Sequence, residues 1–441
     1  MEMLSNFIHA HGIIISGLIL IATYFFIAIE KISKVTVALL GASITIILGL
    51  LSQEKNINGV LNPHYFINFV DFNVIFLLVS MMIIVNIASK SGVFDWMATK
   101  LLKLTKGNPM WVLFALGLFT AVTSAFLDNV TTVILVMPIT FVIAKELNID
   151  PVPFLITEIF ASNIGGTATL IGDPPNIIIG SAANFSFMNF ISELTGIIAL
   201  IFFVSIGILM FLFRKSLIAS PEKMNQVAHL DNSKSITDYP LMTRSLIVLG
   251  LVISGFVLHD VIHLQACVVA MAGASFLLAF ETPQEIIHDV EWNTVFFFIG
   301  LFIIIGGLEA SGGITLMAKW LLCATNSSQG ATSMVVLWGS GLLSGVIDNI
   351  PYTATMAPML VQIQSCMGTQ YTYPLWWCLS LGACLGGNLT IIGAAANVIV
   401  YETADAAGHK ISFMKFLKFG ALITFISLTL SSIYIYFRFL G

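Results

Sequence analysis

Stretches of about 20 apolar residues recur along the whole chain, and each is long enough to cross the ~30 Å hydrocarbon core of a bilayer. They lie at about 12–30, 35–52, 71–90, 154–164 with 175–183, 190–213, 241–258, 264–281, 292–311, 374–385 with 394–401, and 413–437. Only 9% of the 441 residues are charged, whereas soluble domains carry roughly 25%. We therefore expect an all-α integral membrane protein that is not an enzyme, needs no cofactor and binds no nucleic acid.

Two longer apolar stretches, at about 110–145 and 331–363, contain polar residues near their centres. Each is too long for one helix, and a polar tip between two apolar arms is typical of a re-entrant helical hairpin. The runs at 154–183 and 374–401 are interrupted by Gly-rich segments and predict broken helices. Each half of the chain is thus predicted to cross the membrane five times and to hold one hairpin and one broken helix.

The second half repeats the first at a nearly constant distance of 220 or 221 residues. Residues 70–73 (VDFN) recur as 290–293 (VEWN), Asp128-Asn129 recurs as Asp348-Asn349, and 165–176 recurs as 386–397. One register kept over a hundred residues indicates an internal duplication. An odd number of crossings per half makes the two repeats inverted, and we divide the chain into repeat 1 (1–214), a linker (215–239) and repeat 2 (240–441).

The positive charges predict the orientation. With five crossings per half, Lys55, Lys319 and Arg438 fall on one face and the other fifteen Lys and Arg residues on the opposite face. The positively charged face is cytoplasmic by the positive-inside rule. We therefore expect a multi-pass protein of the cell membrane with the linker 215–239 in the cytoplasm and both termini outside.

Broken helices place a substrate site near the bilayer midplane, because irregular backbone is tolerated there only where it lines a cavity. Each break frees carbonyl groups at one half-helix end and N–H groups at the next. The candidate substrate and ion ligands come from the four breaks: Asp128, Asn129, Thr131, Thr132, Gly165, Gly166, Thr167, Thr169, Asp173, Asn176, Asp348, Asn349, Thr353, Thr355, Gly387, Asn388, Thr390 and Asn397.

Asp128 and Asp348 are the main candidates for proton coupling. A carboxylate at the centre of a membrane helix costs ~2.5–3.5 kcal/mol and needs a compensating partner or role. Each Asp also precedes an apolar run, so a helix cap is the alternative, and the two roles are compatible. Glu158 is either a third proton carrier or a structural hydrogen-bonding group, and Asp173 either lines the cavity or caps a half-helix. Asp71 and Glu291 are expected between helices rather than in the site.

The most specific motifs are FLDNVTT (126–132), GGTATLIGDPPN (165–176), IDNIPYTAT (347–355) and GACLGGNLTIIGAAAN (382–397). With them the chain resembles the ion transporter superfamily of ArsB-type arsenite permeases, NhaD-type sodium/proton antiporters and dicarboxylate/sodium symporters. It looks closest to the branch of the melanosomal P protein and bacterial ArsB-like proteins. The resemblance implies a scaffold domain, a transport domain carrying both hairpins, frequent homodimers and elevator-type alternating access.

One departure from the family pattern bears on the substrate. The dicarboxylate symporters carry Ser-Asn-Thr at the hairpin tips, whereas Asp128 and Asp348 stand in place of the two serines here. Two added negative charges repel a dicarboxylate unless protons or cations neutralise them. The resemblance therefore favours a proton-coupled arsenite or antimonite efflux permease, in which Asn129, Asn349, Asn388 and Thr167 bind the solute.

Other functions stay open. A sodium/proton antiporter would use the same carboxylates, with a possible sodium ion held at the hairpin tips among loop carbonyls. An organic-anion or dicarboxylate/sodium symporter and a passive channel are further alternatives. The chain contains no GxxxxGK[ST] phosphate loop, so an ATP-driven pump would need a separate soluble ATPase partner.

Overall fold

The computed structural model describes residues 10–29, 31–51, 66–228, 236–258 and 263–441. Lys55, Lys234 and the central part of the linker (229–235) lie outside the described residues. Within the described part, the regular elements are helices, and eight of them are long and apolar enough to cross a membrane. This confirms the predicted all-α membrane fold.

The first half begins with three long helices, which we call scaffold helices, and continues through a hairpin to a broken helix. Its elements are α2 (Gly12–Ile29), α3 (Lys34–Ile47), η1 (Ile67–Phe69), α4 (Phe72–Lys90), α5 (Val93–Leu104), α6 (Pro109–Ser124), α7 (Asn129–Leu147), α8 (Val152–Gly166), α9 (Pro174–Ala183) and α10 (Phe187–Phe213), followed by the short linker helix α11 (Pro221–Ala228).

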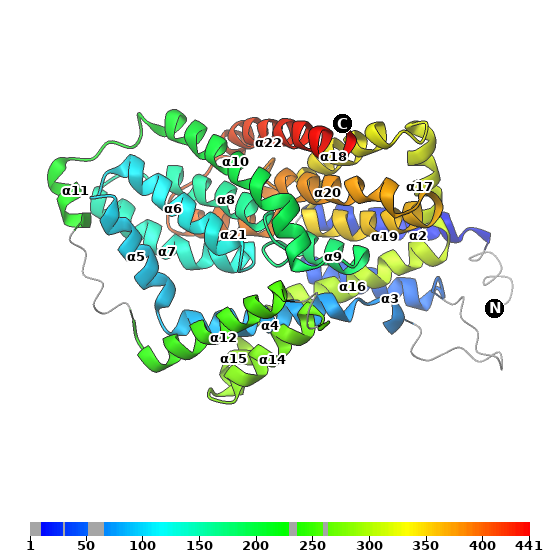
Figure 1. The fold of residues 1–441 in the computed structure, drawn as a ribbon, viewed down its shortest axis with the longest axis horizontal. Helices are drawn as coiled ribbons and strands as arrows, with labels where there is room; N and C mark the ends of the chain where they lie inside the picture. Colours follow the sequence, from blue (N-terminus) through cyan, green and yellow to red (C-terminus); the bar gives the residue numbers. More distant parts are fainter. Residues whose placement is uncertain (1–9, 30, 52–65, 229–235, 259–262) are drawn as a thin grey trace.

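The second half repeats this order. Its elements are α12 (Tyr239–Val257), α14 (Ala266–Leu278), α15 (Pro283–His288), α16 (Trp292–Ala310), α17 (Gly313–Ala324), α18 (Gln329–Ile347), α19 (Asn349–Met367), α20 (Thr369–Gly386), η2 (Ile391–Gly393), α21 (Ala395–Ala406), α22 (Phe413–Ile435) and η3 (Tyr436–Leu440). In Figure 1 the hairpin α6–α7 and helix α5 lie at one end of the long axis, and their equivalents α18–α19 and α17 lie at the other. The two repeats are therefore inverted.

Local sequence sets several helix ends. Asp71 begins α4 by accepting hydrogen bonds from the backbone N–H groups of Asn73 (3.0 Å) and Val74 (3.4 Å). Asn108 begins α6 in the same way, with Pro109 at its first position. Asn148 and Asn184 end α7 and α9 in the left-handed conformation that asparagine tolerates well.

The scaffold helices are exchanged between the repeats. Helix α3 of the first repeat packs on α16 of the second, and α14 of the second packs on α4 of the first. The close approach uses a Gly-Ala-Ser triplet in both places, at 41–43 and 273–275. The missing side chain of Gly41 makes room for Ile304, and that of Gly273 for Val252, Val248 and Ile84. Ile84 and Ile304 are themselves equivalent in the two repeats, so one packing solution is used twice.

The two hairpins dock on the broken helices at small residues. A side chain at Gly165 of α8 would overlap the backbone of Ala121 on α6, and one at Gly386 of α20 would overlap Gly341 on α18. These contacts hold each hairpin tip against the break of its own repeat. The tips differ in length, because residues 125–128 separate α6 from α7 whereas Asp348 alone separates α18 from α19.

Candidate functional site

Asp173 joins the two hairpin tips. Its Oδ1 accepts hydrogen bonds from the Nδ2 of Asn129 (3.2 Å) and of Asn349 (3.3 Å), and the latter also lies 3.1 Å from its Oδ2. Asp173 is fully buried and makes no side-chain cap on α9. Of the two roles expected for it, the structure places the carboxyl group between the tips.

A chain of buried amides continues from the first tip into the second broken helix. Asn129 donates to the Oδ1 of Asn163 (3.4 Å), and Asn163 donates to the Oδ1 of Asn388 (3.0 Å) and of Asn397 (2.9 Å). Asn397 in turn holds the carbonyls of Gly387 and Thr390, as Asn176 holds those of Thr167 and Thr169. Asn163 was absent from the predicted site, although its position two residues before the Gly-Gly break was a usable signal.

Both tip aspartates act as helix caps and keep an oxygen for another contact. Asp128 accepts from the backbone N–H of Val130 (2.8 Å) and Thr131 (3.3 Å), and its second oxygen accepts from the Thr131 hydroxyl. Asp348 accepts from the Ile350 N–H (3.1 Å), while its Oδ2 lies 3.5 Å from the Nζ of Lys34. The helix-cap role expected for both aspartates is thus present, and their role in proton coupling stays a prediction.

A small cavity of about 20 Å³ lies between the tips and the scaffold, with room for roughly one water molecule. Its charged and amide lining consists of Lys34, Asp128, Asn129, Asp173, Glu291 and Asn349. Lys34 and Glu291 were missed as site residues because they begin α3 and α16, outside the four breaks. Glu291 accepts a hydrogen bond from the Thr294 hydroxyl (3.1 Å), and it stands in the cavity wall although the sequence had suggested a helix interface.

The predicted threonines serve different purposes. The Thr169 hydroxyl donates to the carbonyl of Ala125, and the equivalent Thr390 donates to that of Gly345 (2.6 Å), so each ties a break to its own hairpin. Thr167 bonds back to the Asn163 carbonyl within its helix (2.7 Å), and Thr355 lies 2.5 Å from the Tyr24 hydroxyl of the scaffold.

Three buried polar groups near the breaks have no hydrogen-bond partner among the described residues. They are the Thr132 hydroxyl, the Thr353 hydroxyl and the Nδ2 of Asn388. An unpaired buried donor costs free energy unless water or a ligand meets it.

Glu158 lies apart from the tips. It is fully buried on α8, one carboxyl oxygen accepts from the Thr140 hydroxyl of α7, and the other has no partner among the described residues. The contact joins α7 to α8, as expected for the structural role considered for Glu158, and proton carriage by Glu158 stays a prediction.

Known proteins resemble this chain over most of its length. Residues 24–382 match the CitMHS family, which is described as a citrate transporter family. The chain belongs to the CitMHS citrate transporter family. This confirms the resemblance to the ion transporter superfamily.

One relative that matches this CitMHS chain over nearly its full length is named a transporter. An uncharacterized transporter of Mycobacterium tuberculosis is 40% identical over 429 residues, which covers 97% of this chain and 98% of the relative. The mouse P protein is 31% identical over 500 residues, covering 95% of this chain and 59% of the P protein. The YdaH transporter of Alcanivorax borkumensis shares the fold with a TM-score of 0.57 over 96% of this chain and 97% of that one, at 13% identity. The CitMHS chain is thus a membrane transporter and not an enzyme.

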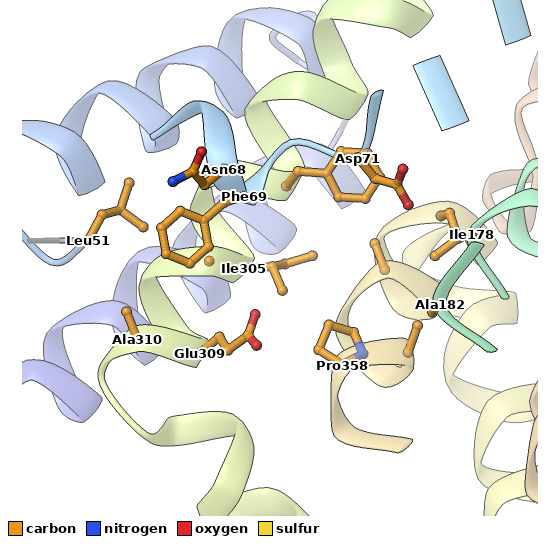
Figure 2. Close-up of a pocket in the computed structure, with 14 residues that line it drawn as sticks. Leu51, Asn68, Phe69, Asp71, Ile178, Ala182, Ile305, Glu309, Ala310 and Pro358 are labelled. Atoms are coloured by element: carbon orange, nitrogen blue, oxygen red, sulfur yellow. The ribbon is translucent and has the colours of Figure 1, made fainter. Parts of the chain in front are cut away.

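Two larger cavities separate the scaffold from the broken helices in this CitMHS member. The first, of about 620 Å³, is bounded by the end of α16 and the start of α4 on one side and by α9 and α19 on the other. Figure 2 shows Glu309 pointing into this space, opposite Pro358 and Ala182. The second, of about 300 Å³, lies where α14 begins and is lined by Asn73, Ala266 and Cys267.

Proposed function

We propose that this chain is a proton-coupled secondary transporter in which carboxylates at the hairpin tips carry the coupling proton. One observation supports this above all others. Two aspartates from different breaks, Asp128 and Asp173, line one small cavity, and a third, Asp348, lies 3.5 Å from Lys34 in the wall of that cavity. Asp173 and Asp348 are buried and Asp128 is partly buried, and carboxylates withdrawn from water in this way bind either protons or cations.

For the solute, we propose arsenite or antimonite efflux. The cavity has more carboxylates than positive charges, which favours an uncharged or cationic solute over an anion. Arsenous acid is uncharged near neutral pH and needs only hydrogen-bonding partners. Asn129, Asn349, Asn388 and Thr167 provide amides and a hydroxyl, and the Nδ2 of Asn388 is unpaired among the described residues.

Sodium/proton exchange is the second candidate. Carboxylate oxygens are ligands that hard cations prefer, and Asp128, Asp173 and Glu291 line the small cavity at the tips. Transport of an organic anion such as citrate, which the family description suggests, is the third. A free tricarboxylate meets repulsion from Asp128, Asp173 and Glu291, so it would have to enter with cations or protons.

We further propose alternating access by an elevator movement. The hairpins and broken helices would move together against the scaffold helices α2, α3, α4, α12, α14 and α16. Open cavities on one side of the site and a nearly closed one on the other support this division. A homodimer in the cell inner membrane, external termini, a cytoplasmic linker and an optional soluble ATPase partner complete the proposal.

Proton flux in proteoliposomes with an imposed pH gradient and an internal pH dye tests the function. Arsenite, sodium, lithium, succinate and citrate are added in turn. We expect arsenite to drive proton flux in the wild type, and we expect Asp128→Asn and Asp348→Asn to reduce it at least about tenfold. Asp405→Asn, which makes the same change at an exposed position of α21, is the control and should match the wild type.

Each other result has a definite meaning. Wild-type flux in both tip variants would show that these carboxylates do not carry the coupling proton. A response to sodium or lithium alone would establish the antiporter, and a response to succinate or citrate alone would establish the anion transporter. No response to any of the five would make all three named functions wrong.

A further inference from the structure

Lys34 brings a positive charge from the scaffold into the transport site. It is the first residue of α3, and its Nζ lies 3.5 Å from the Oδ2 of Asp348 at the second tip. The side chain of Asp348 is only 6% exposed and that of Lys34 36%. The ammonium group also lies 5.5 Å from the centroid of the Phe297 ring on α16, a distance at which an aromatic ring attracts a cation.

The groups that face Lys34 are nearly all acidic. Asp348 contacts it directly, and Asp128, Asp173 and Glu291 line the same cavity. On the neighbouring α2, the Tyr24 hydroxyl donates to the Pro351 carbonyl (2.6 Å) beside the same tip. Among the described residues that line the cavity, Lys34 is the only one with a positively charged side chain. It is therefore the local counter-charge for the site.

We propose that Lys34 is a tethered counter-cation, which occupies Asp348 whenever the site holds no transported cation or proton. This inference rests on the proposed cation- or proton-coupled function and deepens it. A buried carboxylate without a partner is strongly unfavourable, and the ammonium of Lys34 provides that partner without any ion from solution. In the arrangement seen here, the ion pair holds the second tip against α3 and α16.

The position of the pair gives Lys34 a role in coupling. Lys34 belongs to the scaffold, whereas Asp348 belongs to the hairpin that is proposed to move. Movement of this hairpin away from the scaffold therefore breaks the ion pair. A cation or proton from solution then has to replace the ammonium group at Asp348. Movement of the hairpin is unfavourable while no ion has replaced the ammonium group, because Asp348 would then be left without a partner. Lys34 therefore suppresses flux that is not driven by solute.

Lys34 has no charged counterpart in the second repeat. The Gly-Ala-Ser triplets at 41–43 and 273–275 align Lys34 with Ala266. The helix start is thus kept in both repeats, but the charge is present in only one. A lysine needed merely to begin a helix would not require a partner at the opposite hairpin tip.

Solute-independent proton leak is the direct test, and it does not depend on knowing the substrate. Proteoliposomes of the full chain receive a pH gradient with no added solute. We expect Lys34→Met to raise the leak about fivefold or more, the lower range of typical coupling effects. Lys34→Arg should keep the leak near the wild-type level because it retains the charge. Lys31→Met, at an exposed position three residues earlier, is the matched control and should behave as the wild type.

A double-mutant cycle gives a second readout that needs no transport at all. Lys34→Met alone should lower the Tm of the detergent-solubilised protein, because Asp348 loses its partner. Adding Asp348→Asn to Lys34→Met removes the unpaired charge and should recover at least about half of the loss, since contacting residues are not additive. Additive effects of the two substitutions would show that the pair does not form.

The two tests separate the failure of this inference from failure of the proposed function. A wild-type leak in Lys34→Met overturns the tethered counter-cation, whichever solute drives flux. A leak raised equally by Lys34→Arg overturns it too, because the effect then follows from shape rather than charge. A raised leak in Lys34→Met together with silence to every solute keeps Lys34 as counter-cation and rejects the proposed solutes.

Discussion

The two ends of the scaffold have the same backbone frame but different side chains. We call the starts of α3 and α16, with Lys34 and Glu291, the charged end. The equivalent starts of α14 and α4 have Ala266 in place of the lysine and Asp71 in place of the glutamate, and we call them the small-residue end because both side chains are shorter than their counterparts. The tips close on the charged end around a cavity of about 20 Å³, whereas cavities of about 620 and 300 Å³ open near the small-residue end.

An ion pair on the surface also lies next to the charged end and is absent from the equivalent place in the other repeat. Lys90 and Asp289 form a bridge of 2.9 Å between the end of α4 and the turn before α16. The 220-residue register aligns Lys90 with Ala310 and Asp289 with Phe69, and both of these residues line the 620 Å³ cavity. The comparison teaches that duplication supplies two equivalent docking faces, and that the unrepeated ion pairs lie at the face that is closed in this structure.

A fourth unrepeated charge belongs to a broken helix and lies between the hairpin tips. Asp173 aligns with Ala394, so one carboxylate accepts from both tips and the second break contributes none. Asp173→Ala should reduce solute-driven proton flux by about two orders of magnitude, because Asn129 and Asn349 lose their shared acceptor and the tips lose alignment. Ala394→Ser, at the equivalent position, should stay within about threefold of the wild type.

Flux per reconstituted protein, with the solute that activates the wild type, is the measurement for this pair of variants. Equal losses at 173 and 394 would mean that the two breaks contribute alike. The comparison between the charged and small-residue ends would then not extend into the site.

The second prediction concerns the backbone of the two tips. Asp348 has a φ of 95°, whereas Asp128 has a φ of −68°. Positive φ favours glycine over other residues. Asp348→Gly should therefore be more stable than Asp348→Ala by about 1 kcal/mol, and the Gly–Ala difference should be smaller at Asp128, where the backbone is extended. Thermal unfolding of the four variants in detergent decides this, and equal differences at the two tips would contradict it.

The smallest expected effect is at the Lys90–Asp289 bridge. The hydrogen bond from Lys90 holds the pKa of Asp289 below its ordinary value of 3.8. The pair's contribution is thus fully present above pH 3.8 and is lost as the pH falls through the lowered pKa. Both side chains are about 40% exposed, so Lys90→Met should cost less than ~1 kcal/mol at neutral pH.

Thermal unfolding at neutral and acidic pH measures this difference. Lys319→Met, a substitution at an exposed position of α17, is the control. A loss of stability in Lys90→Met that persists unchanged at the lowest pH would show that it does not arise from the ion pair.

Much of the fold follows from the sequence because its signals are local. Apolar length gives the helices, Gly and Pro mark the breaks, and the 220-residue register relates the halves. The site was harder to predict from the sequence. The motifs identify the four breaks, but they do not identify the residues that other helices bring to those breaks. Lys34 reads simply as one more positive charge at a helix start, and only the packing of α3 against α16 brings it to Asp348. Asn163 lies inside an apolar helix, and the sequence does not show which amide groups its side chain contacts.

The exchanged packing of α3 and α16 also governs how the chain must be assembled. While a ribosome is still making the first repeat, α3 is already in place, but the surface it will cover has not yet been synthesised. Helix α4 likewise lacks its packing partner until α14 has been synthesised. Such late, long-range contacts slow folding and leave intermediates with unsatisfied surfaces. The first repeat made alone is therefore an unfinished scaffold, and the newborn chain depends on lipid or an insertion factor to shelter it until the second repeat arrives.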